Sequence, residues 1–336
     1  MKRQLYLLVL PFLFISCEKA MIEKDAAISP IENFESLWNT VDQKYAFFDY
    51  KGIDWNEIHN TYRQKINDNM YDEELFFVLA NMITELRDGH TNLVSPFNIS
   101  RYTFQYSSPE NFNFRLLKDN YIGWDYNITG PLINAFIERD EKLIGYIYYG
   151  SFSSNVSTWH IDYVLSRFHN TDGIILDMRS NGGGNVTNIH TLGSRFADTK
   201  RLIYTTALVN GPGHNDFEEP SEVYMAPRGQ RQYTKPVMLL TNRGCFSATS
   251  FFSTAMKAFP HVIQVGDTTG GGLGAPSGFE LPNGWSYRFS VSETLTPNGE
   301  NFEDGVPPDI SVWMDPEHES AGIDDIMERA IEEILQ

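Results

Sequence analysis

Five short apolar runs between residues 143 and 265 constrain the fold more than any other feature of the chain. They alternate with segments in which apolar residues recur at helical spacing. The apolar runs cover residues 143–149, 173–178, 202–208, 237–241 and 262–265, and the helical segments cover residues 154–169, 185–198 and 247–258. Alternation of buried strands with helices is typical of α/β domains. The pattern therefore predicts a mixed α/β (α+β) core over residues 141–336.

The chain before this core divides into a helical part and a connection. Apolar residues recur every three or four positions in residues 34–45 and 76–86, which predicts amphipathic helices. We therefore expect a helical subdomain over residues 31–95 that ends in a short strand at 92–94, followed by a short β-rich connection at 96–140. Later in the chain, alternation predicts two strands at 278–281 and 285–291, and residues 324–335 have the pattern of an amphipathic helix.

The first residues have the pattern of an export signal. Met1-Lys2-Arg3 is followed by an apolar stretch at 5–15, which is too short to span a membrane, and by Ser16-Cys17. This junction resembles a lipobox, so residues 1–16 are predicted to be a lipoprotein signal peptide and Cys17 the lipid-carrying residue. Residues 17–30 would then be a tether to a membrane of the cell envelope, with periplasmic or outer-membrane exposure. An ordinary cleaved signal or an uncleaved anchor is the alternative.

Composition excludes several classes of partner and site. The chain has 44 Asp and Glu against 26 Lys and Arg and a formal net charge of −18, which argues against binding to nucleic acid. Loss of residues 1–16 and lipidation of Cys17 would leave Cys245 as the only thiol, so no intrachain disulfide is expected. No H-E-x-x-H motif or Cys/His cluster occurs, so neither a metal nor a cofactor is predicted.

Ser247 lies where an apolar strand at 236–241 turns into a helical run at 247–258. The N-terminus of a helix presents unpaired N–H groups and the positive end of the helix dipole, which favour developing negative charge. Ser247 is therefore a candidate nucleophile. The alternative is a simple N-cap, a very common role for serine.

A glycine-rich segment, Asp177-Met-Arg-Ser-Asn-Gly-Gly-Gly184, follows another buried strand. Glycines at such a junction let backbone N–H groups approach a bound atom closely. One use of such groups is phosphate binding, but the Lys-Ser/Thr ending of a P-loop is absent. Another use is an oxyanion hole. A purely structural turn is the third interpretation.

The ordered set of short motifs resembles peptidase family S41. It consists of Leu-Arg-Asp-Gly-His-Thr at 86–91, the segment at 177–184, Ser247-Ala248, Gly-Asp-Thr-Thr-Gly at 266–270 and Gly-Val-Pro-Pro-Asp at 305–309. The resemblance implies a ClpP/crotonase-like core with an N-terminal helical subdomain, and a serine peptidase that hydrolyses a peptide or protein substrate. It also implies one of two catalytic patterns, a Ser-Lys dyad or the Ser-His-Ser-Glu tetrad of the tricorn-like branch.

The tricorn-like pattern fits this chain better, because residues 270–274 contain no lysine and Lys257 lies too far along the helix that begins at Ser247. The resemblance then implies His90 as the general base of Ser247. It implies Glu303 as the group that orients His90, with Glu300 and Asp304 as close rivals. Gly89 replaces the serine that precedes the histidine in the tetrad, and Thr91 is the candidate substitute. The implied oxyanion hole consists of the N–H groups of Gly183 and Ala248.

Two non-catalytic functions remain open at this stage. Relatives that bind retinoids look like S41 proteins used as carriers, and aromatic residues at 97–114 would suit an apolar pocket. A lipoprotein that binds peptides or glycans without turnover is the other. The 96–140 segment is too short for the PDZ module of the processing proteases, so recognition of a substrate C-terminus by such a module is not expected.

Overall fold

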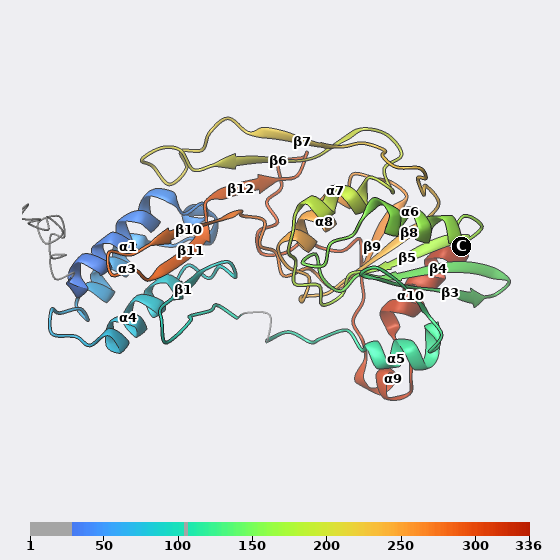
Figure 1. Ribbon diagram of the computed structural model, residues 1–336, viewed down its shortest axis with the longest axis horizontal. Helices are drawn as coiled ribbons and strands as arrows, with labels where there is room; N and C mark the ends of the chain where they lie inside the picture. Colours follow the sequence, from blue (N-terminus) through green and yellow to red (C-terminus); the bar gives the residue numbers. More distant parts are fainter. Residues whose placement is uncertain (1–28, 104–106) are drawn as a thin grey trace, which may run out of the picture.

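The computed structural model describes residues 29–103 and 107–336. The predicted signal peptide, Cys17 and nearly all of the tether lie outside these residues. Two lobes lie side by side, and a small antiparallel sheet runs along one side of both (Figure 1). We call them the helical lobe, which contains α1–α4, and the sheet lobe, which contains the largest sheet. Among the described helices, none combines the length and apolar character that a membrane crossing requires.

The helical lobe begins with α1, which starts where the sequence supplies a strong cap. The Ser29 hydroxyl accepts from the N–H of Glu32, the Glu32 carboxylate accepts from the N–H of Ser29, and Pro30 occupies the first turn. Asp54 caps α3 in a similar way. The apolar faces of these helices form a shared core that includes Phe34, Leu37 and Leu79. The four helices are α1 (Pro30–Lys44), α2 (Phe48–Lys51), α3 (Trp55–Arg63) and α4 (Asp72–Thr84).

A hairpin from the far end of the chain completes the helical lobe. Strands β10 (Pro276–Glu280) and β11 (Ser286–Ser290) pair with β1 (Asn92–Val94) in the order β1-β11-β10. Tyr287 and Phe289 are buried in the same apolar cluster as the helices. The hairpin was expected as part of the 141–336 core, but its alternating aromatic residues give it one apolar face, which packs on the helices instead.

The sheet lobe is built on a seven-stranded sheet with the order β13-β9-β8-β5-β4-β3-β2. The pairs from β13 to β4 are parallel, and β3 and β2 are added in antiparallel fashion. The prediction of a mixed α/β fold is therefore confirmed. Its strands are β2 (Asn127–Thr129), β3 (Leu132–Arg139), β4 (Lys142–Tyr148), β5 (Gly173–Asp177), β8 (Val237–Thr241), β9 (Val262–Gly266) and β13 (Ile310–Ser311).

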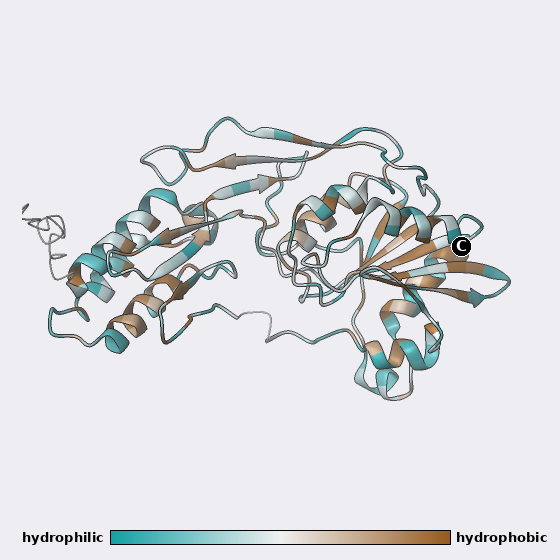
Figure 2. Ribbon diagram, in the orientation of Figure 1, coloured by the Kyte–Doolittle hydropathy of each residue, from teal (hydrophilic) through white to brown (hydrophobic). Residues whose placement is uncertain are grey.

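Helices cover both faces of this sheet, as buried strands without polar alternation require. One face packs against α6 (Thr158–Arg167), α7 (Thr187–Gly193) and α8 (Ala248–Met256). The other packs against α10 (Asp325–Leu335) and the segment before β2. Neighbouring residues of β5 serve opposite faces, because Leu176 belongs to the first cluster and Ile175 to the second. Figure 2 shows these central strands largely in the colour of hydrophobic residues.

Two regions differ from the sequence-based expectation. Residues 114–122 are helical, in α5 (Phe114–Leu117) and a π-helical turn (Lys118–Ile122), where only short strands were expected. The Asn113 side chain caps α5 by accepting from Arg115 and Leu116, a signal that the weak alternation of this segment obscured. Strand β6 (Arg201–Leu208) forms as expected but lies outside the large sheet, in the order β12-β6-β7 with β7 (Ser221–Met225) and β12 (Ser292–Leu295). A short α9 (Pro316–Ser320) precedes α10.

The beginning of the glycine-rich loop after β5 is fixed by a buried ion network. Arg179 is fully buried and its guanidinium lies 2.7 Å from Asp177 and 2.8 Å from Asp324. Tyr146 donates to Asp177 at 3.0 Å. Asp324 also caps α10 by accepting from the N–H groups of Ile326 and Met327. The loop is thereby tied both to its own strand and to the C-terminal helix.

Candidate active site

Ser247 stands at the strand-to-helix turn in a strained backbone conformation. Its φ and ψ are 56° and −120°, a region that favours glycine, and its side chain makes no cap hydrogen bond to α8. Ser247 N–H donates to Gly271 at 2.9 Å, and Phe246 N–H donates to Asn181 at 3.1 Å. The simple N-cap interpretation therefore does not describe this serine. The surrounding loops hold its hydroxyl outward at the beginning of the helix.

His90 meets Ser247 across 157 residues of sequence. Its Nε2 lies 2.9 Å from the Ser247 hydroxyl oxygen. The turn before β1 places the ring, because the Asp88 side chain accepts from the N–H of His90 at 2.7 Å. The Phe246 ring packs against the imidazole with 4.8 Å between centroids. The structure thus brings together the serine and the histidine that the resemblance implied.

The surroundings of His90 favour its neutral form. Burial lowers the pKa of His90 below its usual value of 6.5, and the positive charges of Arg288 and Lys51 lower it further, against an opposing effect of Asp88. A neutral imidazole can accept the proton of the serine hydroxyl. The ring is therefore in the protonation state that a general base needs at neutral pH.

The other nitrogen of the ring faces a serine that the sequence analysis missed. Ser290 is fully buried at the end of β11, and its hydroxyl oxygen lies 3.5 Å from His90 Nδ1 and 3.4 Å from the carbonyl oxygen of Gly274. His90 can donate from Nδ1 to Ser290, which in turn donates to Gly274. This order leaves Nε2 free to accept from Ser247. Ser290 occupies the position expected for Thr91, whose buried hydroxyl has no hydrogen-bond partner within residues 29–103 and 107–336.

Glu303 is close to the site but contacts the loop rather than the histidine. Its carboxylate accepts from the N–H groups of Leu273 and Gly274 at 2.7 and 2.9 Å, and Lys51 lies 4.0 Å away. Burial, with a smaller effect from Asp88, raises the pKa of Glu303 to about 8. Because Gly274 also accepts from Ser290, Glu303 positions the peptide segment on which the Ser290 contact depends.

The two rivals of Glu303 have other partners. Glu300 accepts from the Thr296 side chain at 3.3 Å, and its N–H donates to that hydroxyl. Asp304 is exposed and lies 3.6 Å from Lys51. No hydrogen bond joins Glu300, Glu303 or Asp304 to His90 in the part of the chain that the structure describes. Glu303 is linked to His90 only indirectly, by way of Gly274 and Ser290, among the described residues.

The structure places both residues expected for the oxyanion hole, Gly183 and Ala248, beside Ser247. Ala248 is the first residue of α8, so its N–H has no acceptor within the helix and lies beside the nucleophile. Gly183 packs so closely that an added Cβ would lie 3.0 Å from both Ser247 Cβ and Ala248 N. Its φ of 91° also favours glycine. The Gly183 N–H, however, donates to the Asn181 side chain at 3.0 Å, so it is engaged in this conformation.

Other candidate nucleophiles and bases are occupied elsewhere. Lys257 forms an ion pair with Asp309 at 2.8 Å, and Asp309 also accepts from the N–H of Gln264, which gives it a structural role. Cys245 is buried, and burial raises the pKa of its thiol to about 12. Within the described ranges, no group of three His, Cys, Asp or Glu side chains could hold a metal ion.

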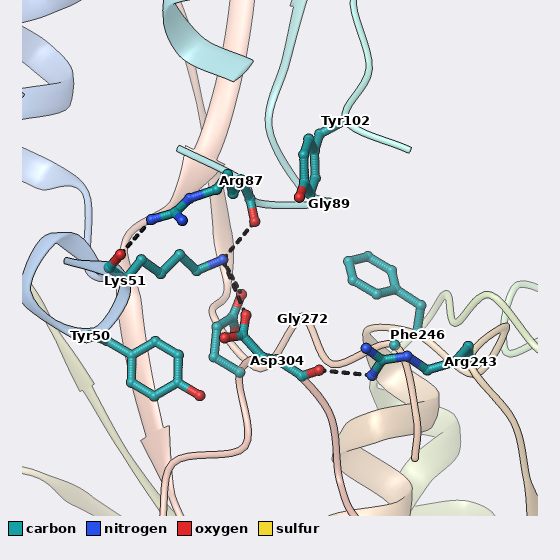
Figure 3. A pocket seen from close by; sticks show the side chains of 11 residues that line it. Tyr50, Lys51, Arg87, Gly89, Tyr102, Arg243, Phe246, Gly272 and Asp304 are labelled. Atoms are coloured by element: carbon teal, nitrogen blue, oxygen red, sulfur yellow. Dashed lines mark hydrogen bonds and ion pairs between the residues drawn. The ribbon is translucent and has the colours of Figure 1, made fainter. Parts of the chain in front are cut away.

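A cavity of about 440 Å³ opens beside the serine–histidine pair, between the two lobes. Lys51 and Arg87 project into it from the helical lobe, and Arg243 and Phe246 face them from the sheet lobe (Figure 3). Gly272 lies between them, and an added Cβ there would lie 3.1 Å from the His90 ring. Phe246 and Gly89, the residues that precede Ser247 and His90, both line the cavity.

A serine in hydrogen-bond contact with a buried histidine, with a helix N-terminus and a glycine loop beside the serine, is typical of the serine hydrolase class. Comparison with known families agrees with this class. The model of peptidase family S41 matches residues 143–312, about half of the chain, and the model of the tricorn protease C1 domain matches residues 30–84. The chain belongs to peptidase family S41.

Individual relatives place the chain within this family. The chain is similar to a candidate peptidase from Parabacteroides merdae whose crystal structure is known. The two share 42% sequence identity, and they superimpose with a TM-score of 0.87 over 92% of this chain and 97% of that one. Carboxy-terminal processing protease CtpA from Bacillus subtilis is 28% identical over 55% of this chain and 38% of its own length. Tricorn protease from Thermoplasma volcanium is 28% identical over 59% of this chain and 18% of its own. The chain thus spans less than half the length of these two curated relatives.

Replacement of Ser247 tests the backbone strain at the turn. The free energy of unfolding should be about 1 kcal/mol higher for Ser247→Gly than for Ser247→Ala, because only glycine adopts this φ without strain. Chemical denaturation measures both. At Ser253, within helical α8, the order should reverse, with glycine about 1 kcal/mol less stable than alanine. Equal stabilities of the two Ser247 variants would contradict the strain.

Proposed function

We propose that this protein is a serine peptidase of the cell envelope in which Ser247 is the nucleophile and His90 its general base. The 2.9 Å contact between Nε2 and the serine hydroxyl carries the proposal. It is supported by the lowered pKa of His90 and by the strained turn that presents Ser247. Family membership supports a peptide as the substrate.

In the proposed reaction, the Ser247 oxygen attacks the peptide carbonyl while its proton passes to His90 Nε2. The carbonyl oxygen becomes an oxyanion that accepts from the Ala248 N–H, and from Gly183 once its N–H leaves Asn181. His90 then protonates the leaving amine, and the acyl-enzyme forms. Water attacks this ester with His90 again as the base, which releases the acid and restores Ser247.

Loss of either member of the pair should abolish turnover. Ser247→Ala and His90→Gln should each lower peptide cleavage by at least about 10³-fold, because the hydroxyl has no other base. A peptide library measures cleavage, and a fluorophosphonate probe measures nucleophile labelling. The exposed residues Ser320 and His169 provide the control variants Ser320→Ala and His169→Gln. Folded wild-type protein that neither cleaves nor labels would favour a non-catalytic binding protein on the same scaffold.

Ser290 is proposed to fix the tautomer of His90. Ser290→Ala should lower kcat about tenfold with little change in KM, the effect of losing one hydrogen bond. The acid limb of the wild-type pH profile should lie below pH 6.5, because burial lowers the pKa of His90 and only its neutral form is a base. The limb should move lower still in the variant, since the hydroxyl no longer stabilises the imidazolium.

Steady-state kinetics from pH 4.5 to 8 give both quantities, with Ser221→Ala on the exposed start of β7 as the control. Wild-type kinetics and an unmoved acid limb in Ser290→Ala would show that Ser290 does not position the base.

The envelope location rests on the sequence at residues 1–17. We propose that Cys17 carries the lipid anchor of the mature protein. Metabolic labelling with a radioactive or alkynyl fatty acid should mark the wild-type protein and leave Cys17→Ala unmarked. Cys245→Ala, which removes the buried thiol, is the matched control and should stay labelled. If the wild-type protein takes up no fatty acid and fractionates away from membranes, the anchor is overturned and the catalytic proposal is unaffected.

A further inference from the structure

A second groove continues from the active-site cavity along the helical lobe. It has a volume of about 900 Å³ and lies across β1, β11 and β10. Gly89 and Tyr102 line both the groove and the active-site cavity, so the two spaces adjoin next to His90. The opposite face of this sheet, which includes Tyr287 and Phe289, packs on the helices. The face toward the groove is therefore the one that a bound chain could contact.

Strand β11 runs from Ser290, next to His90, to Arg288 in the groove. Alternate residues of a strand share a face, so Ser290 and Arg288 point the same way, with about 7 Å between their Cα atoms. Ser290 is covered by His90, whereas Arg288 is exposed and lines the groove. Its neighbour across the pair is Gly278, where an added Cβ would meet nothing within 4 Å. The guanidinium thus has open space beside it.

Arg288 carries a charge that the protein itself does not neutralise. No carboxylate lies within 4.0 Å of it in residues 29–103 or 107–336. Its field reaches the catalytic base, because it contributes to the lowered pKa of His90. Arg101 lines the same groove, and Glu280 lies two residue pairs beyond Arg288, opposite Ser286. Among the described residues that line it, Arg101 and Arg288 outnumber the single carboxylate of the groove, Glu280, so the groove is positive in a chain with a net charge of −18.

We infer that Arg288 determines specificity by selecting peptides with an aspartate or glutamate side chain within four residues of the scissile bond. Arg288 lies about 7 Å further along β11 than Ser290, and Ser247 lies on the other side of the His90 ring from Ser290. An extended peptide advances about 3.3–3.6 Å per residue, so a few residues connect the scissile bond with Arg288. A planar guanidinium binds a carboxylate through paired hydrogen bonds, which gives directional as well as electrostatic selection. The inference rests on the proposed peptidase function.

Matched peptides test the inference. A cleavable peptide carries one Glu, or Gln as its neutral match, at each position up to four residues on either side of the scissile bond. In wild-type protein at low salt, Glu should raise kcat/KM about fivefold over Gln at one or two positions on a single side. In Arg288→Gln this ratio should fall to about one. Arg115→Gln, at an exposed arginine of α5, should keep the wild-type ratio.

Charge reversal and salt separate a direct contact from a general effect. Arg288→Glu should prefer Lys over Gln at the position where the wild type prefers Glu. The wild-type preference should also shrink at high salt, where charges are screened over about 3 Å in 1 M salt. A preference for Glu that survives in Arg288→Gln and Arg288→Glu would overturn the inference. Preference that depends on a free C-terminal carboxylate, tested with amidated peptides, would overturn it as well.

Binding to Ser247→Ala keeps this test independent of catalysis. Fluorescence anisotropy should show the Glu peptide bound about fivefold more tightly than the Gln peptide, and the double variant with Arg288→Gln should bind both equally. Selective binding without cleavage by the wild type would reject the peptidase proposal and retain the acidic-peptide site. Cleavage that depends on Ser247 but lacks any charge preference would reject the site and retain the peptidase. Equal binding of the two peptides by Ser247→Ala likewise rejects the site.

Discussion

The position of the active site depends on one buried ion network. Arg179 is fully buried between Asp177 at the end of β5 and Asp324 at the start of α10, and the Phe112 ring lies 5.1 Å from its guanidinium. Charges removed from water are tolerated only when their hydrogen-bonding capacity is met, so a shift of any partner would leave an uncompensated charge. The network therefore fixes the first turn of the glycine-rich loop. The rest of that loop follows directly, so its position, including that of Gly183 beside Ser247, depends on this network.

The side chains of Asn181 and Asn242 connect the glycine-rich loop to the turn that contains Ser247. The Asn181 side chain donates to the backbone carbonyl of Tyr149 and accepts from the N–H groups of Phe152 and Gly183. The backbone carbonyl of Asn181 accepts from the N–H of Phe246. Asn242, in the turn after β8, accepts from the N–H of Ser180 and donates to the Ser180 hydroxyl. These short amides replace backbone pairing where strands have ended. Strain at Ser247 persists because the bonds on both sides leave the turn no relaxed alternative. The same set of bonds engages the Gly183 N–H, which donates to the Asn181 side chain.

Sequence patterns predicted the local elements well and the long-range contacts unevenly. Strand β8 and helix α10 lie where the apolar run at 237–241 and the helical spacing at 324–335 indicated. His90 was found because its Asp-Gly-His-Thr context resembles a family motif. Ser290 was missed because it lies 200 residues from His90 on an ordinary strand, and strand alternation does not reveal which partner an inward hydroxyl meets. The hairpin of β10 and β11 was assigned to the wrong lobe for a similar reason: its apolar face required burial but did not specify against which helices.

The two halves of the site come from different lobes, and a polar joint holds them in register. Ser247 and its N–H donors belong to the sheet lobe, whereas His90 and Ser290 belong to the helical lobe. Residues 303 and 304 lie between them. Lys51 reaches these acids from α2, and Arg243 donates to the carbonyl of Asp304 from the nucleophile turn (Figure 3). A purely apolar joint could slide, since hydrophobic contact is not directional. Directional bonds are needed here because the base must remain within hydrogen-bond reach of a hydroxyl on the other lobe.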